Sequence, residues 1–286
     1  MTLLLLLALA QEEIRLLVRS DDMGAAQSIN EGCVKSVLDG IARSVEVIVP
    51  GPWYPQAVRL LKEHPEIEVG LHLCLTSEWE DLKWGPLTHA PSLVDVDGHF
   101  FPTTRQRKEF PPNTSFLEAG PKPEEVEREL RAQIERALRS GLRIDYVDYH
   151  MGTPLSTPEF RDVTERLARE FNLGMSGYFG EASHDPQYWA QPQHKTDSLV
   201  AMVARLRPGL NVVVTHVGID DAELGALVDM NTSNPLPDMS KNRQGELDAL
   251  TSPRFGEALR ARNVQLVTYR QLIDRQGLKS MRRPGG

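Results

Sequence analysis

Cysteine is nearly absent from this sequence, which has two cysteines in 286 residues and none at zinc-finger or redox spacing. Cys33 lies in a helical pattern and Cys74 in a strand pattern, so both are interpreted first as small buried apolar residues. Export would permit a disulfide between them, but a sequence does not show whether two cysteines meet. Cysteine chemistry therefore gives no indication of function.

A surplus of basic residues is also missing. The chain has 32 Lys and Arg against 40 Asp and Glu, for a formal net charge of -8, and it has no basic run. Such a charge disfavours nucleic acids and anionic membrane surfaces as partners, and we expect no nucleic-acid partner. With 40% hydrophobic and 25% charged residues, the composition is that of an ordinary globular protein, and the length suits one large α/β domain.

No apolar run is long enough to span a bilayer, which takes about 20 residues. The longest run, Leu3–Ala10, ends in a small-x-small pattern typical of signal-peptide cleavage, although no Lys or Arg precedes it. We interpret residues 1–10 as a signal-peptide remnant and 11–286 as a single domain, and we expect a secreted, periplasmic or cell-envelope protein. A short buried N-terminal element is the alternative, and it would indicate a cytoplasmic protein. The sequence leaves a homo-oligomer open.

Short runs rich in Val, Ile and Leu alternate with longer helical patterns. Most of the short runs lack polar alternation, as expected of parallel strands buried on both faces. This order predicts an α/β fold, namely a (β/α) barrel, closed or nearly closed, with mostly parallel strands. A doubly wound open sheet is the alternative. The predicted strands are Ile14–Arg19, Arg43–Val49, Val69–Leu75, Ile144–Tyr149, Asn211–Thr215 and Val264–Thr268, with a weaker one at Gly174–Tyr178; the predicted helices are Ser28–Asp39, Pro55–Glu63, Pro123–Ser140, Phe160–Phe171, Ser198–Leu206 and Gly256–Arg262.

Three connections are too long and irregular to be simple turns. They are Thr76–Lys122, Gly180–Lys195 and Gly218–Arg243, and each follows a predicted strand. Loops of this length in a compact domain are usually either functional or disordered. We therefore expect all three at the carboxyl face of the barrel, where barrel enzymes build their active sites.

Polar residues that can bind metals or transfer protons stand at the ends of four predicted strands. Asp21 and Asp22 end the first strand, and we expect their adjacent carboxylates to point to different sides. His72, His150 and His216 lie at the ends of three later strands. A turn or a core histidine would explain any one of these features alone, but in a barrel all four converge on one face. Histidine and aspartate together suit a divalent ion with an open coordination position.

A set of ordered motifs resembles the YdjC-like carbohydrate deacetylases. The similarity extends from about Ile14 to about Leu272, and the motifs are specific as a set rather than singly. They are Ser20-Asp21-Asp22-Met23-Gly24, Asn30-Glu31-Gly32, Gly70-Leu71-His72-Leu73-Cys74-Leu75-Thr76, the segment Ser92–Phe101, and Asp148-Tyr149-His150.

The resemblance implies a (β/α) barrel, one divalent metal ion and deacetylation of an acetylated amino sugar or oligosaccharide. By position, Asp22, His72 and His150 match the metal ligands, and Asp21 matches the general base. His216 matches the region of a general acid. The resemblance favours magnesium, with zinc or another divalent ion as alternatives.

Two features depart from the family pattern. His216-Val217-Gly218 lacks the proline of the family's His-Pro-Gly segment, and Met151-Gly152 replaces the end of its Asp-x-His-x-His form. Neither change removes a proposed ligand, but both bear on the substrate and on the role of His216. Four aromatic residues in the long loops are candidates for stacking on sugar rings or, equally, for packing the loops onto the rim: Trp79, Trp84, Tyr188 and Trp189.

Two other functions remain as alternatives. A glycoside hydrolase on a barrel would use two carboxylates about 5–10 Å apart, and the adjacent Asp21 and Asp22 are poorly placed to flank one bond. An exported sugar-binding protein would keep the pocket without turnover. Sensitivity to chelators and release of acetate distinguish these hypotheses.

Overall fold

A single parallel sheet organises the molecule. The computed structural model describes residues 13–231 and 238–284. Its strands follow the order β5-β4-β3-β2-β1-β7-β6, with β8 also pairing with β1, and every strand ladder is parallel. The strands are β1 (Ile14–Met23), β2 (Ser44–Val47), β3 (Glu68–Leu73), β4 (Ile144–Tyr149), β5 (Gly174–Met175), β6 (Ala182–His184), β7 (Gly209–Thr215) and β8 (Gln265–Leu266).

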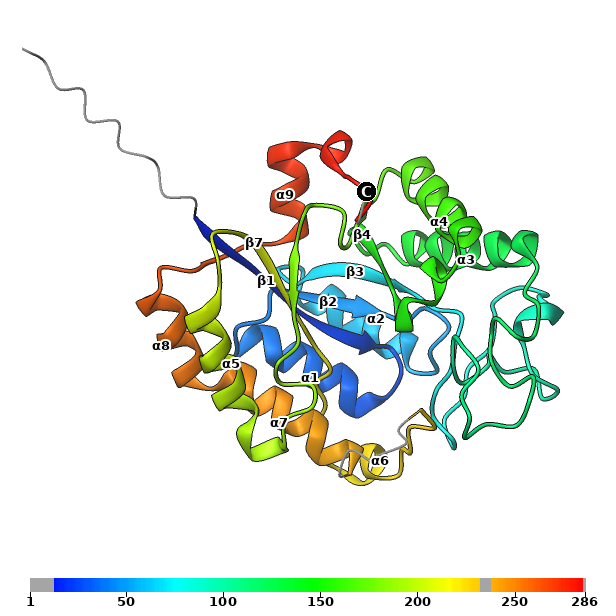
Figure 1. Ribbon diagram of the computed structural model, residues 1–286, viewed down its shortest axis with the longest axis horizontal. Helices are drawn as coiled ribbons and strands as arrows, with labels where there is room; N and C mark the ends of the chain where they lie inside the picture. Colours follow the sequence, from blue (N-terminus) through cyan, green and yellow to red (C-terminus); the bar gives the residue numbers. More distant parts are fainter. Residues whose placement is uncertain (1–12, 232–237, 285–286) are drawn as a thin grey trace, which may run out of the picture.

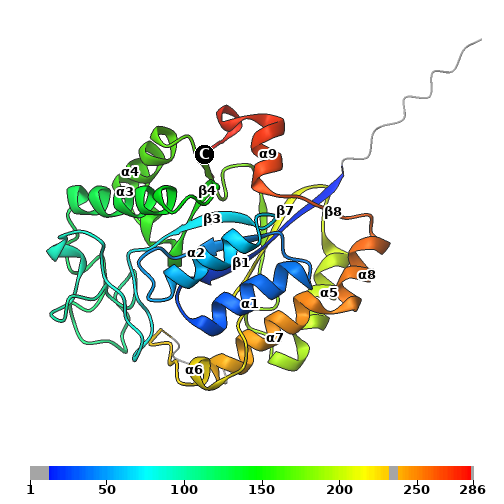
Figure 2. The same ribbon diagram turned by 180° about the vertical axis from the view of Figure 1, so that it is seen from behind.

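The sheet curls into a half-barrel with helices around its outside (Figure 1). Within the described residues no ladder joins the edge strands β5 and β6. The prediction of an α/β barrel of parallel strands is confirmed, and the structure adds that the barrel stays open along one side. Figure 2 shows the same arrangement from behind.

The main apolar core lies between the sheet and the surrounding helices. Ile29 and Cys33 of α1 pack there against Val45 of β2, and all three are fully buried. Helix α4 begins after Thr157, whose hydroxyl accepts a hydrogen bond from the backbone N–H of Phe160, as its capping sequence predicts. The outer helices are α1 (Gln27–Leu38), α2 (Tyr54–Glu63), α3 (Pro123–Arg139), α4 (Pro158–Glu170), α5 (Lys195–Arg205), α6 (Ala222–Gly225), α7 (Met239–Thr251) and α8 (Pro253–Ala261).

Helix α9 (Tyr269–Gln276) packs against the amino ends of the strands. The Glu68 carboxylate, at the start of β3, accepts a hydrogen bond from the backbone N–H of Tyr269 at 3.0 Å. The Tyr269 ring packs on Tyr146 with centroids 4.1 Å apart. Leu17 and Leu272 belong to the same small buried cluster. This packing covers the amino end, so the carboxyl ends of the strands remain as the place for a site.

Four helices and strands among the described residues were not predicted from the sequence: β6, α6, α7 and α9. α6 is a short helix inside the connection Gly218–Arg243. β6 lies inside the connection Gly180–Lys195, and α9 lies beyond the last predicted strand. α7 was missed because its buried face carries polar residues, including Asn242, Arg243 and Glu246, rather than an apolar stripe. Apolar periodicity detects helices that cover a core, and α7 instead presents side chains to a cavity.

Other expectations from the sequence have different outcomes. Cys33 and Cys74 are both buried and free, so the permitted disulfide does not form. The interpretation of residues 1–10 as a signal peptide falls outside the described residues. Among the helices that the structure describes, none combines the length and the apolar character needed to cross a membrane.

Candidate active site

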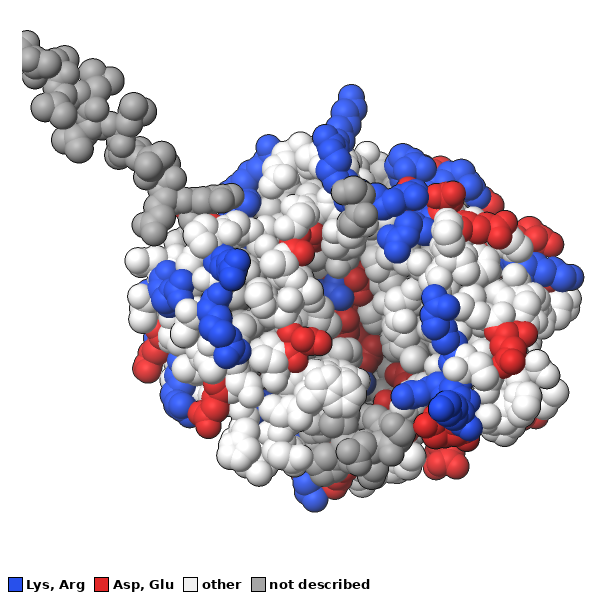
Figure 3. Space-filling model, viewed as in Figure 1, with Lys and Arg blue, Asp and Glu red and all other residues white. Residues whose placement is uncertain are grey.

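A cavity of about 280 Å³ opens at the carboxyl ends of the strands. Figure 3 shows a hollow in this face of the molecule, with acidic side chains gathered inside. Each of the three long connections contributes to its wall, for example through Glu78, Tyr188 and Asp229. The prediction that these loops meet at one face is confirmed.

Asp21 and Asp22 both line this cavity. Adjacent side chains of a regular strand point to opposite faces. Here, however, the pairing of β1 with β2 shifts register between Ser20 and Met23, and Asp22 adopts a left-handed conformation with φ 72°. Aspartate tolerates that region better than most residues. The expectation that the two carboxylates point to different sides is therefore wrong, because the backbone turns both toward one space.

Asp22, His72 and His150 form a buried group of ligand atoms that all lie within 4.8 Å of one another. Oδ1 of Asp22 lies 3.5 Å from Nε2 of His72 and 3.3 Å from Nδ1 of His150, yet it makes no hydrogen bond to any residue that the structure describes. Ligands about 2.1 Å from a tetrahedral ion lie about 3.4 Å apart. A buried oxygen without a hydrogen-bond donor at this spacing fits a cation shared by the three residues.

Each of the two imidazoles is held by a carboxylate on its other side. Nδ1 of His72 lies 2.8 Å from Oδ2 of Asp148, and Nε2 of His150 donates to Oε2 of Glu78 at 2.8 Å. Such contacts fix which ring nitrogen faces the cation and orient the ring. His72 thus presents Nε2 to Asp22, whereas His150 presents Nδ1.

The carboxylates also change the protonation of these rings. Burial works to lower the pKa of both imidazoles, but the neighbouring carboxylates outweigh it. Asp148 and Asp22 raise the pKa of His72 to about 9, and Glu78 raises the pKa of His150 well above its usual value. The raised pKa values favour the doubly protonated form of both rings, so protons compete with a cation for the ring nitrogens and cation binding depends on pH.

Arg19 contacts both Asp148 and Asp21 on the inner face of the half-barrel. Its guanidinium donates to Oδ1 of Asp148 at 2.5 Å, and its Nε lies 3.2 Å from Oδ1 of Asp21. The strand register brings these groups together, because His72 pairs with Asp148 on the neighbouring strand and Arg19 precedes Asp21 by two residues on the same face. All of these side chains are buried.

Asp21 and Asp22 have opposite pKa shifts. Burial is the largest influence on both, and it raises the pKa of Asp21 above its ordinary value despite the nearby Arg19. For Asp22, the neighbouring Arg243 and the two nearby imidazoles overcome burial and hold the pKa well below its ordinary value. Neighbouring groups whose pKa values are pushed apart commonly have different roles. Asp22 is thus suited to bind a cation and Asp21 to accept a proton.

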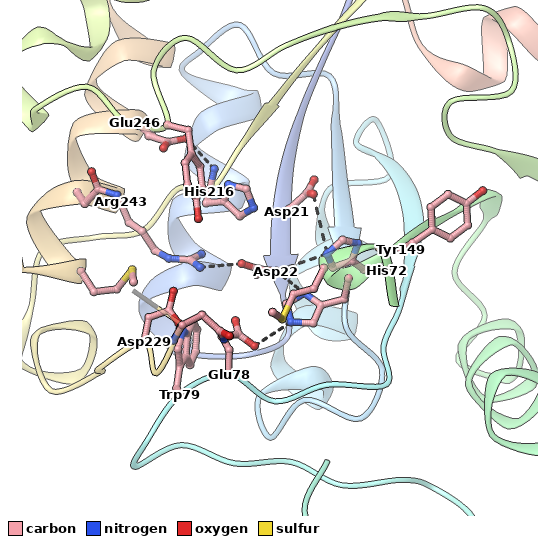
Figure 4. Close-up of a pocket in the computed structure, with 17 residues that line it drawn as sticks. Asp21, Asp22, His72, Glu78, Trp79, Tyr149, His216, Asp229, Arg243 and Glu246 are labelled. Carbon is pink, nitrogen blue, oxygen red and sulfur yellow. Dashed lines mark hydrogen bonds and ion pairs between the residues drawn. The ribbon is translucent and has the colours of Figure 1, made fainter. Parts of the chain in front are cut away.

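His216 lies beside Asp21. Thr215 of β7 pairs with Ser20 of β1, and His216 and Asp21 are the next residues of the two chain segments. Its backbone N–H donates to Oε2 of Glu246 at 2.8 Å, and its ring meets that of Tyr188 edge-on at 5.5 Å. Nδ1 of His216 is buried and makes no hydrogen bond within the described part of the chain. Figure 4 shows His216 next to Asp21 and outside the group formed by Asp22 and His72.

The four aromatic candidates have different surroundings. Trp79 lines the cavity but is 1% exposed, and the Arg243 guanidinium lies over its ring at 5.3 Å. Trp84 is buried outside the cavity wall, where its indole N–H donates to the carbonyl of Thr76. For these two residues, packing describes the observed contacts. Tyr188 lines the cavity, and Trp189 packs on it while remaining 69% exposed, so sugar contact by this pair stays a prediction.

Five residues that hold the site together received no role from the sequence. Asp148 appeared only as part of the motif Asp148-Tyr149-His150. Arg19 had a weak signal, as a charged residue in an apolar strand run two positions before Asp21. Glu78 lies in an irregular loop, and Arg243 and Glu246 lie on the polar face of α7. Arg243 meets Asp22 across 221 positions of the chain, a proximity that no local pattern reveals.

The chain is similar to known proteins over most of its length. A carbohydrate deacetylase of Vibrio vulnificus strain YJ016 is 28% identical over 271 residues, which cover 91% of this chain and 97% of that protein. A carbohydrate deacetylase of Geobacillus stearothermophilus is 28% identical over 264 residues, or 89% of this chain and 96% of that protein. A crystal structure from Enterococcus faecalis V583, described as that of a candidate cellobiose-phosphate cleavage protein, shares the fold. Its TM-score is 0.72 at 22% identity, with 91% of this chain and 99% of that chain covered.

The family assignment rests on a match that spans most of the chain. The sequence profile described as YdjC-like protein matches residues 15–261, a range that holds every residue of the site described above. The chain therefore belongs to the family of YdjC-like proteins.

Proposed function

We propose that this protein is a carbohydrate deacetylase that uses a divalent cation to hydrolyse the acetamide group of N-acetylated amino sugars. One observation carries the proposal: the cation-binding group of Asp22, His72 and His150 borders the same cavity as Asp21 and His216. The choice of reaction is supported by curated relatives named carbohydrate deacetylase, which this chain matches over nearly their whole length.

The cation would be held by Oδ1 of Asp22, Nε2 of His72 and Nδ1 of His150. When bound, a divalent cation polarises a carbonyl group and lowers the pKa of water, which are the two requirements of amide hydrolysis at neutral pH. Two imidazoles and one carboxylate suit a borderline ion such as zinc better than magnesium, which prefers oxygen ligands. The family resemblance favours magnesium, so both ions enter the test.

Proton transfer falls to the two residues beside the cation site. Asp21 takes the proton from the attacking water as general base, and its raised pKa brings it closer to the working pH of such a base. Arg19 holds Oδ1 of Asp21 in place. His216, on the neighbouring strand, then donates a proton to the departing sugar amine. Tyr188, whose ring packs edge-on against His216, borders the space for the sugar.

Acetate release tests the proposal. The purified protein is stripped of metal with a chelator and then assayed on N-acetylglucosamine oligomers with magnesium, zinc, cobalt or manganese. We expect acetate release only after a divalent ion is restored, and none from a folded His72→Ala variant. Activity that survives the chelator and yields new reducing ends instead of acetate would indicate a glycoside hydrolase. Sugar binding without either product would indicate a binding protein.

A further inference from the structure

Arg243 contacts the one oxygen of Asp22 that faces away from the imidazoles. Nη2 of Arg243 donates to Oδ2 of Asp22 at 2.7 Å, whereas Oδ1 faces His72 and His150. The Arg243 side chain is 6% exposed and that of Asp22 is 2% exposed. Figure 4 shows Asp22 between His72 on one side and Arg243 on the other. The two oxygens of Asp22 therefore have separate partners.

The Trp79 ring stacks against the guanidinium of Arg243. The Arg243 guanidinium carbon lies 5.3 Å from the centre of the Trp79 ring, a typical cation–π distance. Among the described residues, Nε and Nη1 of Arg243 are buried without hydrogen-bond partners, and stacking on Trp79 and the bond to Asp22 are the contacts that fix this side chain. Trp79 in turn packs edge-on against Trp84 at 5.8 Å. The tryptophans thus hold Arg243 in one position.

We propose that Arg243, supported by Trp79, is a positioning residue that restricts Asp22 to binding the cation through Oδ1 alone. This inference rests on the cation site of the proposed function. A carboxylate can bind a divalent ion through one oxygen or through both. By occupying Oδ2, Arg243 keeps a coordination position free for water and substrate, which a hydrolytic metal site requires.

The role predicts that cation affinity and turnover respond differently to loss of Arg243. The guanidinium repels a cation bound close by, so its removal should leave the affinity unchanged or increase it. Asp22 is then free to bind through both oxygens and to occupy the position that the reaction needs. Turnover should fall by roughly 10–100-fold, the usual effect of removing a residue that orients a metal ligand.

The test compares Arg243→Met, which removes the charge and the donors, with Arg243→Lys, which retains both in a different shape. Cobalt is the probe, because its visible absorption weakens as its coordination number rises. For Arg243→Met we expect cobalt affinity equal to or above that of the native protein, weaker visible absorption, lower kcat and unchanged KM. Arg243→Lys should restore the native spectrum and much of kcat. The matched control is Arg254→Met, which removes an exposed arginine paired with Asp197 on the surface.

Three outcomes would overturn the proposal. Parallel loss of cobalt binding and kcat in Arg243→Met would mean that the arginine merely holds the site together. A raised KM with native spectrum and affinity would make Arg243 a substrate contact. A native spectrum with native kcat would show that Asp22 binds the cation through one oxygen without help from Arg243. If Arg243→Met does not fold, Trp79→Leu removes the support instead and should weaken the absorption in the same direction.

The spectrum also separates this inference from the proposed function. Cobalt affinity and absorption are measured without any sugar, so they report on Asp22 even if the native protein releases no acetate from the oligomers tested. A native protein that binds no cobalt would contradict both the proposed function and the inference. A native protein that binds cobalt but lacks activity would contradict only the function.

Discussion

The two ends of the sheet both bury acidic side chains, but the pKa values of these side chains shift in opposite directions. At the carboxyl end, Arg243 and Arg19 counter burial and hold the pKa values of Asp22 and Asp148 below their ordinary range. At the amino end of β3, burial raises the pKa of Glu68 to about 7, and within β2 it raises that of Glu46 well above its ordinary value. All four carboxylates are at most 3% exposed.

The difference follows the direct hydrogen bonds from arginine side chains, which Asp22 and Asp148 accept, because all four carboxylates are buried. Glu46 accepts a hydrogen bond from the hydroxyl of Tyr146, and Glu68 accepts from backbone N–H groups of α9. Neither receives a hydrogen bond from an arginine side chain. Protonation lets them stay buried at low cost, whereas the paired aspartates remain charged and can attract a cation. Asp21 stands between the two cases, because burial raises its pKa although Arg19 lies beside it.

The largest expected effect tests whether Asp21 differs in role from Asp22. Asp21→Asn removes the proton acceptor but leaves Asp22 and both imidazoles in place. We expect turnover to fall by roughly 10²–10⁴-fold, as is usual for loss of a general base. Cation binding, measured by equilibrium dialysis, should persist. Loss of the cation together with activity would show that the division of roles between the aspartates is wrong.

The next effect tests whether the charged end depends on its ion pairs. Asp148→Asn leaves the buried Arg19 with Asp21 as its remaining carboxylate contact within hydrogen-bond distance among the described residues. We expect the free energy of unfolding in urea to fall by about 3–5 kcal/mol, as for other broken buried ion pairs. The matched change Glu46→Gln replaces a carboxyl group whose pKa is raised by burial with a neutral amide, and it should cost about 1 kcal/mol or less. Equal losses in the two variants would remove the contrast between the ends.

The smallest effect concerns the pH dependence of stability through Glu68. Its pKa is raised from 4.5 to about 7 in the folded protein, so the folded state binds this proton more tightly than the unfolded state does. The resulting stability is fully present below pH 4.5 and is lost as the pH rises through about 7. Between pH 4.5 and 8, the unfolding free energy of the native protein should therefore fall by about 3 kcal/mol more than that of Glu68→Gln. Parallel pH curves for the two proteins would contradict the raised pKa.

Much of the fold could be predicted because local patterns report on strands that are buried on both faces. The predicted strand Ile144–Tyr149 agrees with β4, and the predicted helix Pro123–Ser140 agrees with α3 to within one residue. The openness of the barrel could not be predicted, because it depends on which strands pair. α7 escaped detection because its buried face is polar.

The sequence by itself determined the residues that can bind a cation. Asp22, His72 and His150 stand at strand ends, and the carboxyl ends of parallel strands meet at one edge of a sheet. Only the tertiary structure decided how each of them is held. The left-handed turn at Asp22, the carboxylates behind the imidazoles and the arginine from α7 all come from contacts between distant segments. Such contacts depend on packing in three dimensions, which a local pattern of residues does not encode.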